Sequence, residues 1–301
     1  MQVLNQQINL PLLQEKGISL SVKREDAIHP LISGNKYRKL KYNLLEAKRQ
    51  NFKTLLTFGG AYSNHIAATA YAGKIHGFKT IGVIRGEELK EKWLDNPTLF
   101  QANKNGMTFH FTNRQSYQLK ESESFLNRLR LKFGSFFVIP EGGTNSLAIK
   151  GCEEILTEND KEFNFISCCV GTGGTIAGLI NSSNSNQRIL GFPALQGDFL
   201  KDDIRKFAQN ENWELISDYH FGGYAKVDKS LVCFMNDFRS ETGIIIDPIY
   251  TGKMFYGLFD RITKDYFLPG TKVLAIHTGG LQGIIGMNSI LKKKNLPLLD
   301  L

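Results

Sequence analysis

Three short apolar runs in this chain each end at a glycine-rich loop, and this pattern restricts the fold more than any other feature of the sequence. We predict strands over these runs and helices after the first two loops, at 66–74 and 176–180. Strands and helices that alternate with short connections are typical of parallel sheets flanked by helices, so we expect an α/β protein. The runs and their loops are 54–58 with Gly59-Gly60, 163–170 with Gly171 to Thr175, and 272–277 with Thr278-Gly279-Gly280.

The rest of the chain continues this alternation, with neither an internal repeat nor a low-complexity linker. Alternating or continuous apolar runs predict further strands, and apolar residues at helical spacing predict further helices. A polar loop is expected over 181–187. The further strands are expected at 20–24, 80–84, 107–111, 136–139, 188–192 and 243–246, and the further helices at 40–45, 96–105 and 121–132.

The loop from Gly171 to Thr175 is the best candidate for a phosphate site. Its three glycines expose backbone N–H groups, its two threonines add hydroxyl donors, and the helix that follows adds a favourable dipole. No Gly-Lys-Ser/Thr follows it, and Ile176 occupies the place of the last glycine of a dinucleotide fingerprint. A phosphate monoester therefore fits better than a nucleotide, although a tight strand-to-helix turn would also explain the glycines.

Lys36 is the candidate for covalent chemistry, because it follows a Gly34-Asn35 turn and opens a short amphipathic helix. Gly34 and Asn35 tolerate unusual backbone angles, so the chain can turn sharply there. A lysine in the first helical turn faces positive partial charge, which favours the neutral, nucleophilic amine. The alternative is a solvated surface position, as expected for the neighbouring Lys39, Lys41, Lys48 and Lys53.

Ser63, Asn64 and His65 stand together at the start of another expected helix. All three side chains can donate hydrogen bonds toward a carboxylate or a phenolate-like oxygen. Simple N-capping by Ser63 or Asn64, with His65 incidental, is the alternative. The two roles can coexist.

Composition narrows the class of protein. With 301 residues, 42% of them apolar and 22% charged, the chain matches a soluble globular protein large enough for two subdomains. Its net charge of +8 is spread along the chain without an aromatic-interleaved basic motif, so we expect no nucleic-acid binding. Residues 1–20 do not read as a signal peptide, and no apolar run approaches the length of a membrane span. The four cysteines show neither metal-ligand spacing nor a disulfide framework, so we expect no metal site and a cytoplasmic location.

Together these motifs resemble the 1-aminocyclopropane-1-carboxylate deaminase/D-cysteine desulfhydrase family. The resemblance implies a pyridoxal 5'-phosphate enzyme with the two-domain fold (fold type II) of the tryptophan synthase β-subunit. It implies a larger domain of 1–40 and 151–301, a smaller domain of 41–150, an active site in the cleft between them, and a homodimer. The matching stretches are Lys23-Arg24-Glu25-Asp26, Gly34 to Leu40, Ser63-Asn64-His65, Gly171 to Thr175, Asp247 to Lys253 and His277 to Gly280.

The resemblance also implies a role for each site residue. Lys36 would carry the cofactor covalently and move protons after substrate displaces it. Asn64 would hydrogen-bond the phenolic oxygen of the cofactor, and Ser63, Asn64 and His65 would hold the substrate carboxylate, with Ser63 also able to move protons. Tyr250 would face the substrate, and a second active-site tyrosine would be Tyr224. The phosphate would be cradled by Gly171, Thr172, Gly173, Gly174 and Thr175.

Two threonines favour the desulfhydrase branch of this family. In the deaminases a glutamate follows the tyrosine of the Asp-Pro-x-Tyr motif and sits by the pyridine nitrogen, whereas this chain has Thr251 there. Thr278 also matches the desulfhydrase pattern, and which of the two threonines faces the nitrogen is left open. A neutral hydroxyl leaves the ring a weaker electron sink, which suits loss of a good leaving group such as sulfide. We therefore predict α,β-elimination from a small D-amino acid, converting D-cysteine to pyruvate, sulfide and ammonia.

Two alternatives remain open. One is deamination of 1-aminocyclopropane-1-carboxylate to 2-oxobutanoate and ammonia, and the other is a non-catalytic small-molecule-binding protein that keeps the fold. The chain departs from the family at Ile66-Ala67-Ala68, where polar or basic residues are common, and at His29-Pro30 before the lysine turn. These departures concern the substrate more than the cofactor.

Overall fold

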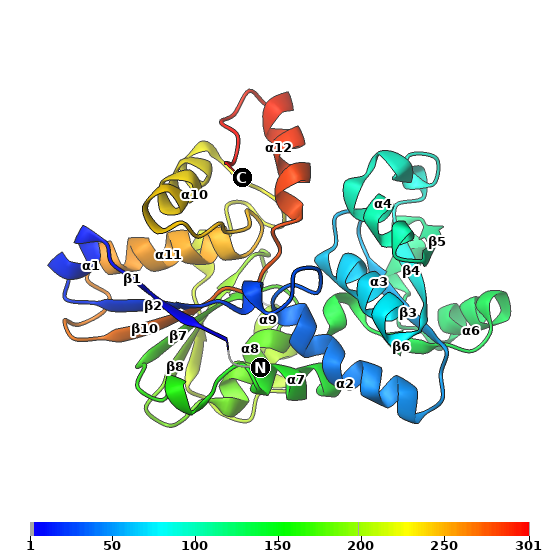
Figure 1. Ribbon diagram of the computed structural model, residues 1–301, viewed down its shortest axis with the longest axis horizontal. Helices are drawn as coiled ribbons and strands as arrows, with labels where there is room; N and C mark the ends of the chain where they lie inside the picture. Colours follow the sequence, from blue (N-terminus) through cyan, green and yellow to red (C-terminus); the bar gives the residue numbers. More distant parts are fainter. Residues whose placement is uncertain (1–2, 198, 301) are drawn as a thin grey trace. The chain divides into compact units, whose positions relative to one another are not determined.

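The computed structural model describes residues 3–197 and 199–300, and the chain divides into two compact units (Figure 1). Unit 1 comprises Met1–Asn35 and Cys152–Leu301, and unit 2 is Lys36–Gly151. The chain therefore passes from unit 1 to unit 2 at the peptide bond between Asn35 and Lys36. It returns within helix α7 (Ser146–Glu153).

Unit 1 contains a six-stranded sheet in the order β1-β2-β10-β7-β8-β9. All neighbouring strands are parallel except β1 and β2, which are antiparallel. Since β2, β10 and β7 run the same way and are neighbours, their carboxyl ends lie along one edge of the sheet. The strands are β1 (Asn5–Ile8), β2 (Ser19–Lys23), β7 (Phe165–Val170), β8 (Arg188–Pro193), β9 (Trp213–Leu215) and β10 (Lys272–Ile276).

Helices cover both faces of this sheet, because its central strands are apolar on both sides. Val273 and Ala275 of β10 pack among residues of α10, α11 and α12, whereas Leu274 and Ile276 pack with α8 and α9. The helices of unit 1 are α1 (Pro11–Glu15), α8 (Gly174–Ser182), α9 (Phe199–Arg205), α10 (Lys229–Thr242), α11 (Thr251–Thr263) and α12 (Gly283–Lys293).

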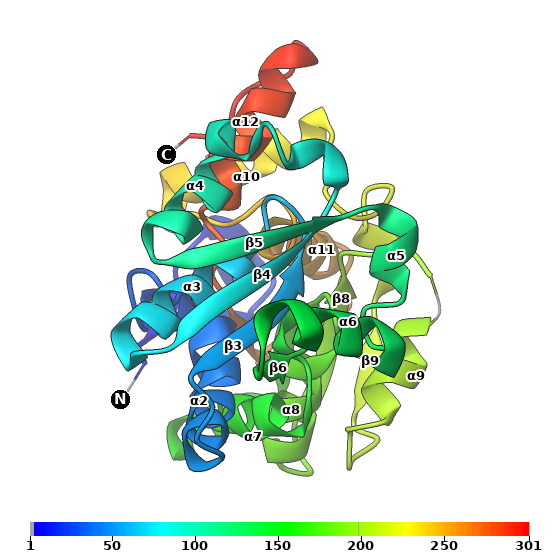
Figure 2. The same ribbon diagram turned by 90° about the vertical axis from the view of Figure 1, so that its right-hand side faces the viewer.

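Unit 2 contains a four-stranded parallel sheet in the order β5-β4-β3-β6, which can be followed in Figure 2. Phe58 of β3 packs with residues of α5 and α6 on one face, and Ile84 of β4 packs with α3 and α4 on the other. The strands are β3 (Thr54–Gly59), β4 (Lys79–Arg85), β5 (Met107–Thr112) and β6 (Phe137–Ile139), and the helices are α2 (Asn35–Arg49), α3 (Asn64–His76), α4 (Pro97–Lys104), α5 (Arg114–Gln118) and α6 (Glu123–Phe133).

The prediction of an α/β protein with parallel sheets flanked by helices is confirmed. Helix α2 is longer than the predicted 40–45, because its buried face includes Arg38, Lys39 and Asn43, which a search for apolar spacing does not count. Helix α3 begins at an N-cap, Ser63, and ends before Gly77, which adopts the left-handed conformation with a φ of 75°.

The strand predicted at 243–246 is wrong, since this segment joins neither sheet. Side chains satisfy its backbone instead: Ile244 N donates to Thr242 Oγ1 (3.2 Å), and Ile245 O accepts from His277 Nε2 (2.7 Å). Ile244 and Ile246 are buried beside the helices of unit 1. The apolar run therefore reflects burial rather than strand pairing.

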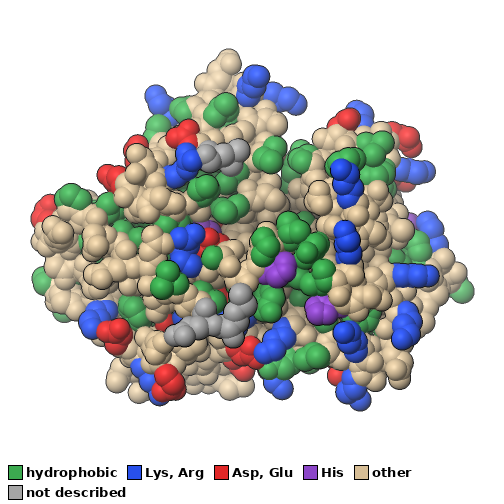
Figure 3. Space-filling model, viewed as in Figure 1, with side chains coloured by type: hydrophobic (Ala, Val, Ile, Leu, Met, Phe, Trp, Pro, Cys, Tyr) green, Lys and Arg blue, Asp and Glu red, His purple; other side chains and the backbone are tan. Residues whose placement is uncertain are grey.

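Within the described ranges, no helix combines the length and the apolar character required to cross a bilayer. On the face drawn in Figure 3, Lys and Arg side chains are dispersed and do not gather into one basic patch. The four cysteines lie in the described part of the chain, where Cys152, Cys168 and Cys169 are buried and Cys233 is half-buried.

Candidate active site

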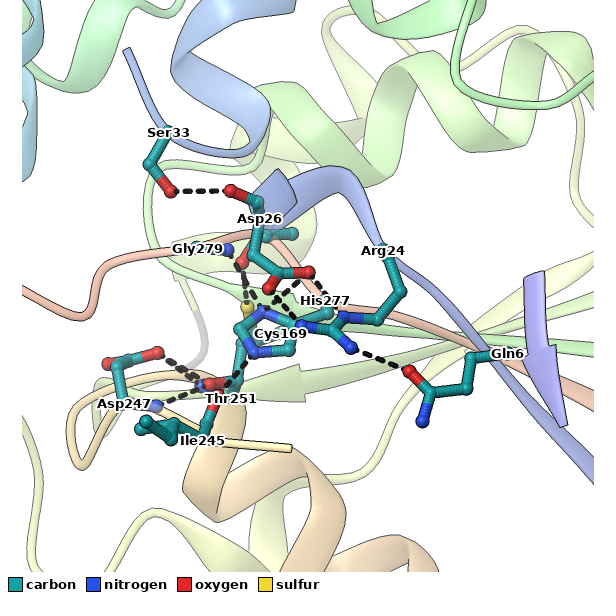
Figure 4. Close-up of polar contacts among 11 residues, drawn as sticks. Gln6, Arg24, Asp26, Ser33, Cys169, Ile245, Asp247, Thr251, His277 and Gly279 are labelled. Atoms are coloured by element: carbon teal, nitrogen blue, oxygen red, sulfur yellow. Dashed lines mark hydrogen bonds and ion pairs between the residues drawn. The ribbon is translucent and has the colours of Figure 1, made fainter. Parts of the chain in front are cut away.

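The turn that precedes Lys36 is anchored at the edge of the unit 1 sheet, beyond the carboxyl end of β2. Arg24 donates to both carboxylate oxygens of Asp26, from Nε over 2.9 Å and from Nη2 over 2.8 Å (Figure 4). Ser33 Oγ donates to the backbone carbonyl of Asp26 over 3.3 Å. The loop from Asp26 to Ser33 is therefore closed on itself immediately before the Gly34-Asn35 turn.

This turn packs directly on the loop that follows β10. Gly34 adopts a φ of 62°, and a Cβ there would lie 1.7 Å from the carbonyl oxygen of Thr278. Gly279 adopts a φ of 79°, and a Cβ there would lie 2.3 Å from Ser33 Oγ. Asn35 N also donates to Thr278 O over 3.3 Å. The two backbones approach so closely that glycine is required on both sides.

The loop after β7 forms a backbone-lined cradle at the start of α8. Gly173 is the N-cap, with a φ of 78°, and a Cβ there would lie 3.0 Å from Ile204 Cγ1. At Gly171 a Cβ would lie 2.9 Å from Tyr250 Cε1. The absence of side chains at these two positions leaves backbone and the positive end of the α8 dipole to face an anion.

Asp247 fixes the corner that begins α11 by accepting four hydrogen bonds. Its Oδ1 accepts from Ile249 N (2.9 Å) and Tyr250 N (2.8 Å), and its Oδ2 accepts from N (2.8 Å) and Oγ1 (2.7 Å) of Thr251. Asp247 N donates back to Thr251 Oγ1 over 2.8 Å. Thr251 is fully buried, so its hydroxyl serves this corner. Which of Thr251 and Thr278 faces a cofactor ring stays a prediction.

His277 holds the other threonine of interest in place. Its Nε2 lies 2.7 Å from Ile245 O, and its Nδ1 accepts from Gly279 N over 3.2 Å. A carbonyl can only accept and an N–H can only donate, so His277 is the neutral tautomer with hydrogen on Nε2. Between His277 and Gly279, Thr278 lies with its Oγ1 3.0 Å from Cys169 Sγ. Figure 4 shows the contacts of His277 with Ile245 and Gly279.

Two tyrosines pack together beside the cradle. The rings of Tyr224 and Tyr250 lie edge to face with centroids 6.1 Å apart, and Tyr224 is 42% exposed. Burial, together with Tyr224 and Asp247, raises the pKa of Tyr250 well above its usual value. Tyr250 is therefore a phenol at neutral pH, able to donate a hydrogen bond but not to act as a ready base.

In unit 2, Lys36 shares an acceptor with a second lysine. Lys36 Nζ donates to Gly142 O over 3.3 Å, and Lys39 Nζ donates to the same oxygen over 3.1 Å and to Thr144 Oγ1 over 3.0 Å. Lys36 is half-buried, whereas Lys39 is only 2% exposed. The expectation that Lys39 is solvated surface is wrong, because the loop after β6 covers it. Lys41, Lys48 and Lys53 are exposed as expected.

His65 is buried close to these two lysines. It is 2% exposed, and its Nε2 lies 2.7 Å from Thr57 Oγ1, which donates to Ile139 O. Burial lowers its pKa well below the usual value, and the positive charges of Lys36 and Lys39 lower it further. His65 is therefore neutral. Its 2% exposure leaves little of the ring open to a substrate, and the implied contact with a substrate carboxylate stays a prediction.

The other residues of the Ser63-Asn64-His65 stretch lie at the start of α3. Ser63 caps this helix, with Oγ accepting from Ile66 N over 3.3 Å, and Asn64 is the first helical residue. The capping alternative thus holds for Ser63, while its hydroxyl keeps a proton to donate.

Each unit therefore gathers its own set of candidate residues. The edge of the unit 1 sheet brings together Tyr224, Tyr250, Thr278 and the loop Gly171 to Thr175, in which Thr172 is exposed and Gly174 and Thr175 are buried. The start of α2 in unit 2 brings Lys36 to His65 and Lys39. No role was predicted from the sequence for Lys39, Gly142 or His277. Gly142-Gly143 follows a predicted strand as the other glycine loops do, and that signal could have identified it.

Comparison with known proteins gives a consistent result. The family model described as "Pyridoxal-phosphate dependent enzyme" matches residues 4–279. A bifunctional D-cysteine desulfhydrase/1-aminocyclopropane-1-carboxylate deaminase of Arabidopsis thaliana mitochondria is 33% identical over 92% of this chain and 75% of its own length. A Thermotoga maritima protein provisionally named 1-aminocyclopropane-1-carboxylate deaminase is 32% identical over 93% of this chain and 94% of its own. The crystal structure of an ACC deaminase homologue superposes with a TM-score of 0.85, at 29% identity, over 97% of this chain and 94% of its own.

Proposed function

Because this chain belongs to the family of pyridoxal-phosphate dependent enzymes, we propose that it catalyses α,β-elimination from a small D-amino acid, with D-cysteine as the leading substrate. The balanced reaction converts D-cysteine and water to pyruvate, hydrogen sulfide and ammonia. The runner-up reaction, for which relatives are also named, is hydrolytic opening of 1-aminocyclopropane-1-carboxylate to 2-oxobutanoate and ammonia.

The residues of unit 1 fit the phosphate of the cofactor. The cradle has Gly171 and Gly173 at positions where a Cβ would lie 2.9 Å from Tyr250 and 3.0 Å from Ile204. It leads directly into α8, a helix of nine residues. A doubly charged phosphate is favoured there by backbone N–H groups and by the helix dipole. Asn35 Nδ2 donates to Thr175 Oγ1 over 2.7 Å, and the next residue in the chain is Lys36. This continuity supports Lys36 as the residue that would bind the cofactor covalently.

Each remaining role follows from the chemistry of the side chain. Pyridoxal phosphate supplies an electron sink that stabilises negative charge at the substrate Cα. We propose that Lys36 Nζ removes the Cα proton. Its amine lies close to that of Lys39, because both donate to Gly142 O. We propose that Asn64 holds the phenolic oxygen and that Ser63 holds the substrate carboxylate through its hydroxyl proton. Tyr250 faces the substrate as a neutral phenol. The released 2-aminoacrylate hydrolyses to pyruvate and ammonia.

The observation that carries elimination over ring opening is the arrangement of Thr278. Its hydroxyl lies beside Cys169 at the carboxyl end of β10, so a neutral side chain occupies that place. The carboxylate of Asp247 is engaged in four hydrogen bonds at the start of α11. We propose that Thr278, rather than Thr251, faces the ring nitrogen. A weak electron sink is sufficient when sulfide leaves from Cβ, whereas opening an unactivated cyclopropane demands more of the ring.

The test is a side-by-side assay of the purified holoenzyme. Sulfide and pyruvate are measured with D-cysteine and L-cysteine, and 2-oxobutanoate with 1-aminocyclopropane-1-carboxylate. We expect kcat/KM for D-cysteine to exceed that of the cyclopropane substrate. Substantial 2-oxobutanoate with little sulfide would favour the runner-up reaction instead. If the protein binds the cofactor but turns over no amino acid, the result would support the alternative of a non-catalytic small-molecule-binding protein.

Reduction with borohydride, followed by peptide mapping, tests the covalent residue. We expect the cofactor on Lys36 and unmodified Lys39, although both amines contact Gly142 O. Cofactor found on Lys39 would overturn the assignment.

We propose further that the protein is a homodimer in the cytoplasm. The homodimer is an expectation from the family resemblance, and the cytoplasmic location is an expectation from the cysteine spacing in the sequence, which shows no disulfide framework. Light scattering after size-exclusion chromatography tests the assembly, and cell fractionation tests the location, which matters because the Arabidopsis relative is named as mitochondrial.

A further inference from the structure

Lys253 is a buried lysine to which no step of the proposed reaction assigns a role. It lies in α11, two residues beyond Thr251, and its side chain is 1% exposed. Its Nζ donates to the backbone carbonyls of His220 (2.8 Å) and Gly223 (2.7 Å). A charged side chain is rarely buried to this extent unless its donors are engaged.

The segment that Lys253 holds has an unusual backbone. Phe221, Gly222, Gly223 and Ala225 adopt positive φ angles of 54°, 85°, 111° and 55°, so two residues that carry a Cβ are in the left-handed region. Such a conformation is unfavourable for these residues and persists only when surrounding contacts maintain it. The sequence alone therefore does not explain the shape of this loop.

Hydrogen bonds inside the loop meet at two of its carbonyl groups. Gly223 N donates to His220 O (2.9 Å), Gly222 N donates to His220 Nδ1 (2.9 Å), and Lys226 N donates to Gly223 O (3.2 Å). His220 O and Gly223 O are thus the two carbonyls around which the loop turns. Each of them accepts its second hydrogen bond from Lys253.

The position of Lys253 links this loop to the tyrosine pair. Tyr224 lies inside the loop, and its ring contacts Tyr250, which is the N-cap of α11. Lys253 is on the first turn of the same helix, so it joins the loop to the element that orients Tyr250. We propose that Lys253 is a positioning residue that fixes Tyr224 against Tyr250 by anchoring the carbonyls of His220 and Gly223. This inference rests on the proposed function only in giving Tyr224 a part in substrate turnover.

The first experiment needs no turnover. Lys226 and Lys229 are exposed, so trypsin can cut there once the loop opens. Wild type as purified is compared with Lys253→Met, which keeps the length of the side chain and removes its donors. Lys264→Met is the matched control, because Lys264 lies just beyond α11 with its side chain 69% exposed. Cleavage after Lys226 and Lys229 is followed by mass spectrometry.

We expect Lys253→Met to raise the rate of cleavage at these two sites about tenfold, with no change at sites outside the loop, and Lys264→Met to leave it unchanged. An unchanged rate in Lys253→Met would overturn the inference. If Lys253→Met does not fold, Lys253→Gln retains an N–H donor group and serves instead. It should give an intermediate rate, and wild-type protection in that variant would count against the inference equally.

The second experiment measures coupling in the holoenzyme. Tyr224→Phe should lower kcat/KM about tenfold in the wild type and less than about twofold in Lys253→Met, because the tyrosine is already displaced there. Equal losses in both backgrounds would contradict a positioning role. An enzyme that turns over neither substrate but still shows the cleavage effect would remove the proposed function and leave the anchoring of the loop by Lys253 intact.

Discussion

Asn35 and Thr175 are joined by a hydrogen bond of 2.7 Å from Nδ2 to Oγ1, although 140 residues separate them. Asn35 is the last residue of unit 1 before Lys36, and Thr175 lies in the first turn of α8. The turn before Lys36, the proposed reactive lysine, is therefore joined directly to the loop proposed to hold phosphate. A substitution in either the turn or the loop should therefore change the affinity for the cofactor.

Gly34→Ala tests the close approach of this turn to the loop after β10. The new Cβ would lie 1.7 Å from Thr278 O, so the backbone must move. We expect a loss of roughly 3 kcal/mol in cofactor binding, about a hundredfold in Kd, from overpacking and the left-handed conformation together. Titration of cofactor absorbance measures it.

Gly77→Ala is the control for Gly34→Ala. Its φ of 75° is similarly left-handed, but a Cβ there meets nothing within 4 Å. It should cost about 1 kcal/mol of stability and leave Kd unchanged. Equal effects of the two variants on Kd would show that the close contact is unimportant.

The phosphate loop is tested by a pair of variants at Gly173. Asp and Asn have nearly the same shape, so both suffer equally from the φ of 78° and from the Cβ that would lie 3.0 Å from Ile204. Only Asp places a negative charge against a phosphate dianion. We expect Gly173→Asp to bind cofactor at least about tenfold more weakly than Gly173→Asn, with the difference shrinking in 1 M salt. Identical affinities would mean that the phosphate lies elsewhere.

Thr251 and Thr278 should respond differently to replacement by Val. In Thr251→Val, Asp247 Oδ2 loses the hydroxyl that donates to it, and Asp247 N–H loses its acceptor, in a fully buried corner. Urea unfolding should therefore show a free energy of unfolding lower by about 1–3 kcal/mol. Thr278→Val should alter the ratio of kcat/KM values for D-cysteine and the cyclopropane substrate. A change of that ratio in Thr251→Val alone would assign the ring position to Thr251 after all.

The sequence predicted the loops better than the contacts between them. Glycines after apolar strands identified the cradle and the loop after β10, because the end of a parallel strand has a readable signature. The burial of Lys39 had no such signature, since the β6 loop that covers it is more than a hundred residues away in the chain. The motif likewise identified Thr251 but could not predict where its side chain points. That orientation depends on whether the carboxylate of Asp247 accepts the hydroxyl proton of Thr251.

The false strand at 243–246 has a similar cause. Burial makes a segment apolar whether or not a neighbouring strand pairs with it. Here the carbonyl oxygen of Ile245 accepts a hydrogen bond from the ring of His277 instead of from a neighbouring strand. No local sequence pattern predicts that contact.

Lys253 predicts a pH dependence of stability with a definite sign. Burial lowers its pKa to about 8, while Asp247 opposes the shift. An unfolded lysine titrates near 10.4, so between about pH 8 and 10.4 the unfolded chain binds more protons than the folded one. This lysine therefore makes the free energy of unfolding rise with pH across that window. Below about pH 8 the buried ammonium gives its largest penalty.

The measurement compares urea unfolding of wild type and Lys253→Met at pH 7.0 and 9.5. Other titratable side chains lie on α11, in the loop that Lys253 contacts and in the segments that flank them, and both proteins contain them all. They are Asp218, Tyr219, His220, Tyr224, Lys226, Asp247, Tyr250, Tyr256, Asp260 and Arg261. Their titration cancels in the difference to first order. We expect the wild type to gain stability relative to Lys253→Met as the pH rises. A difference that is constant, or that falls, would mean that Lys253 keeps an ordinary pKa and that its ammonium is fully stabilised by the two carbonyls.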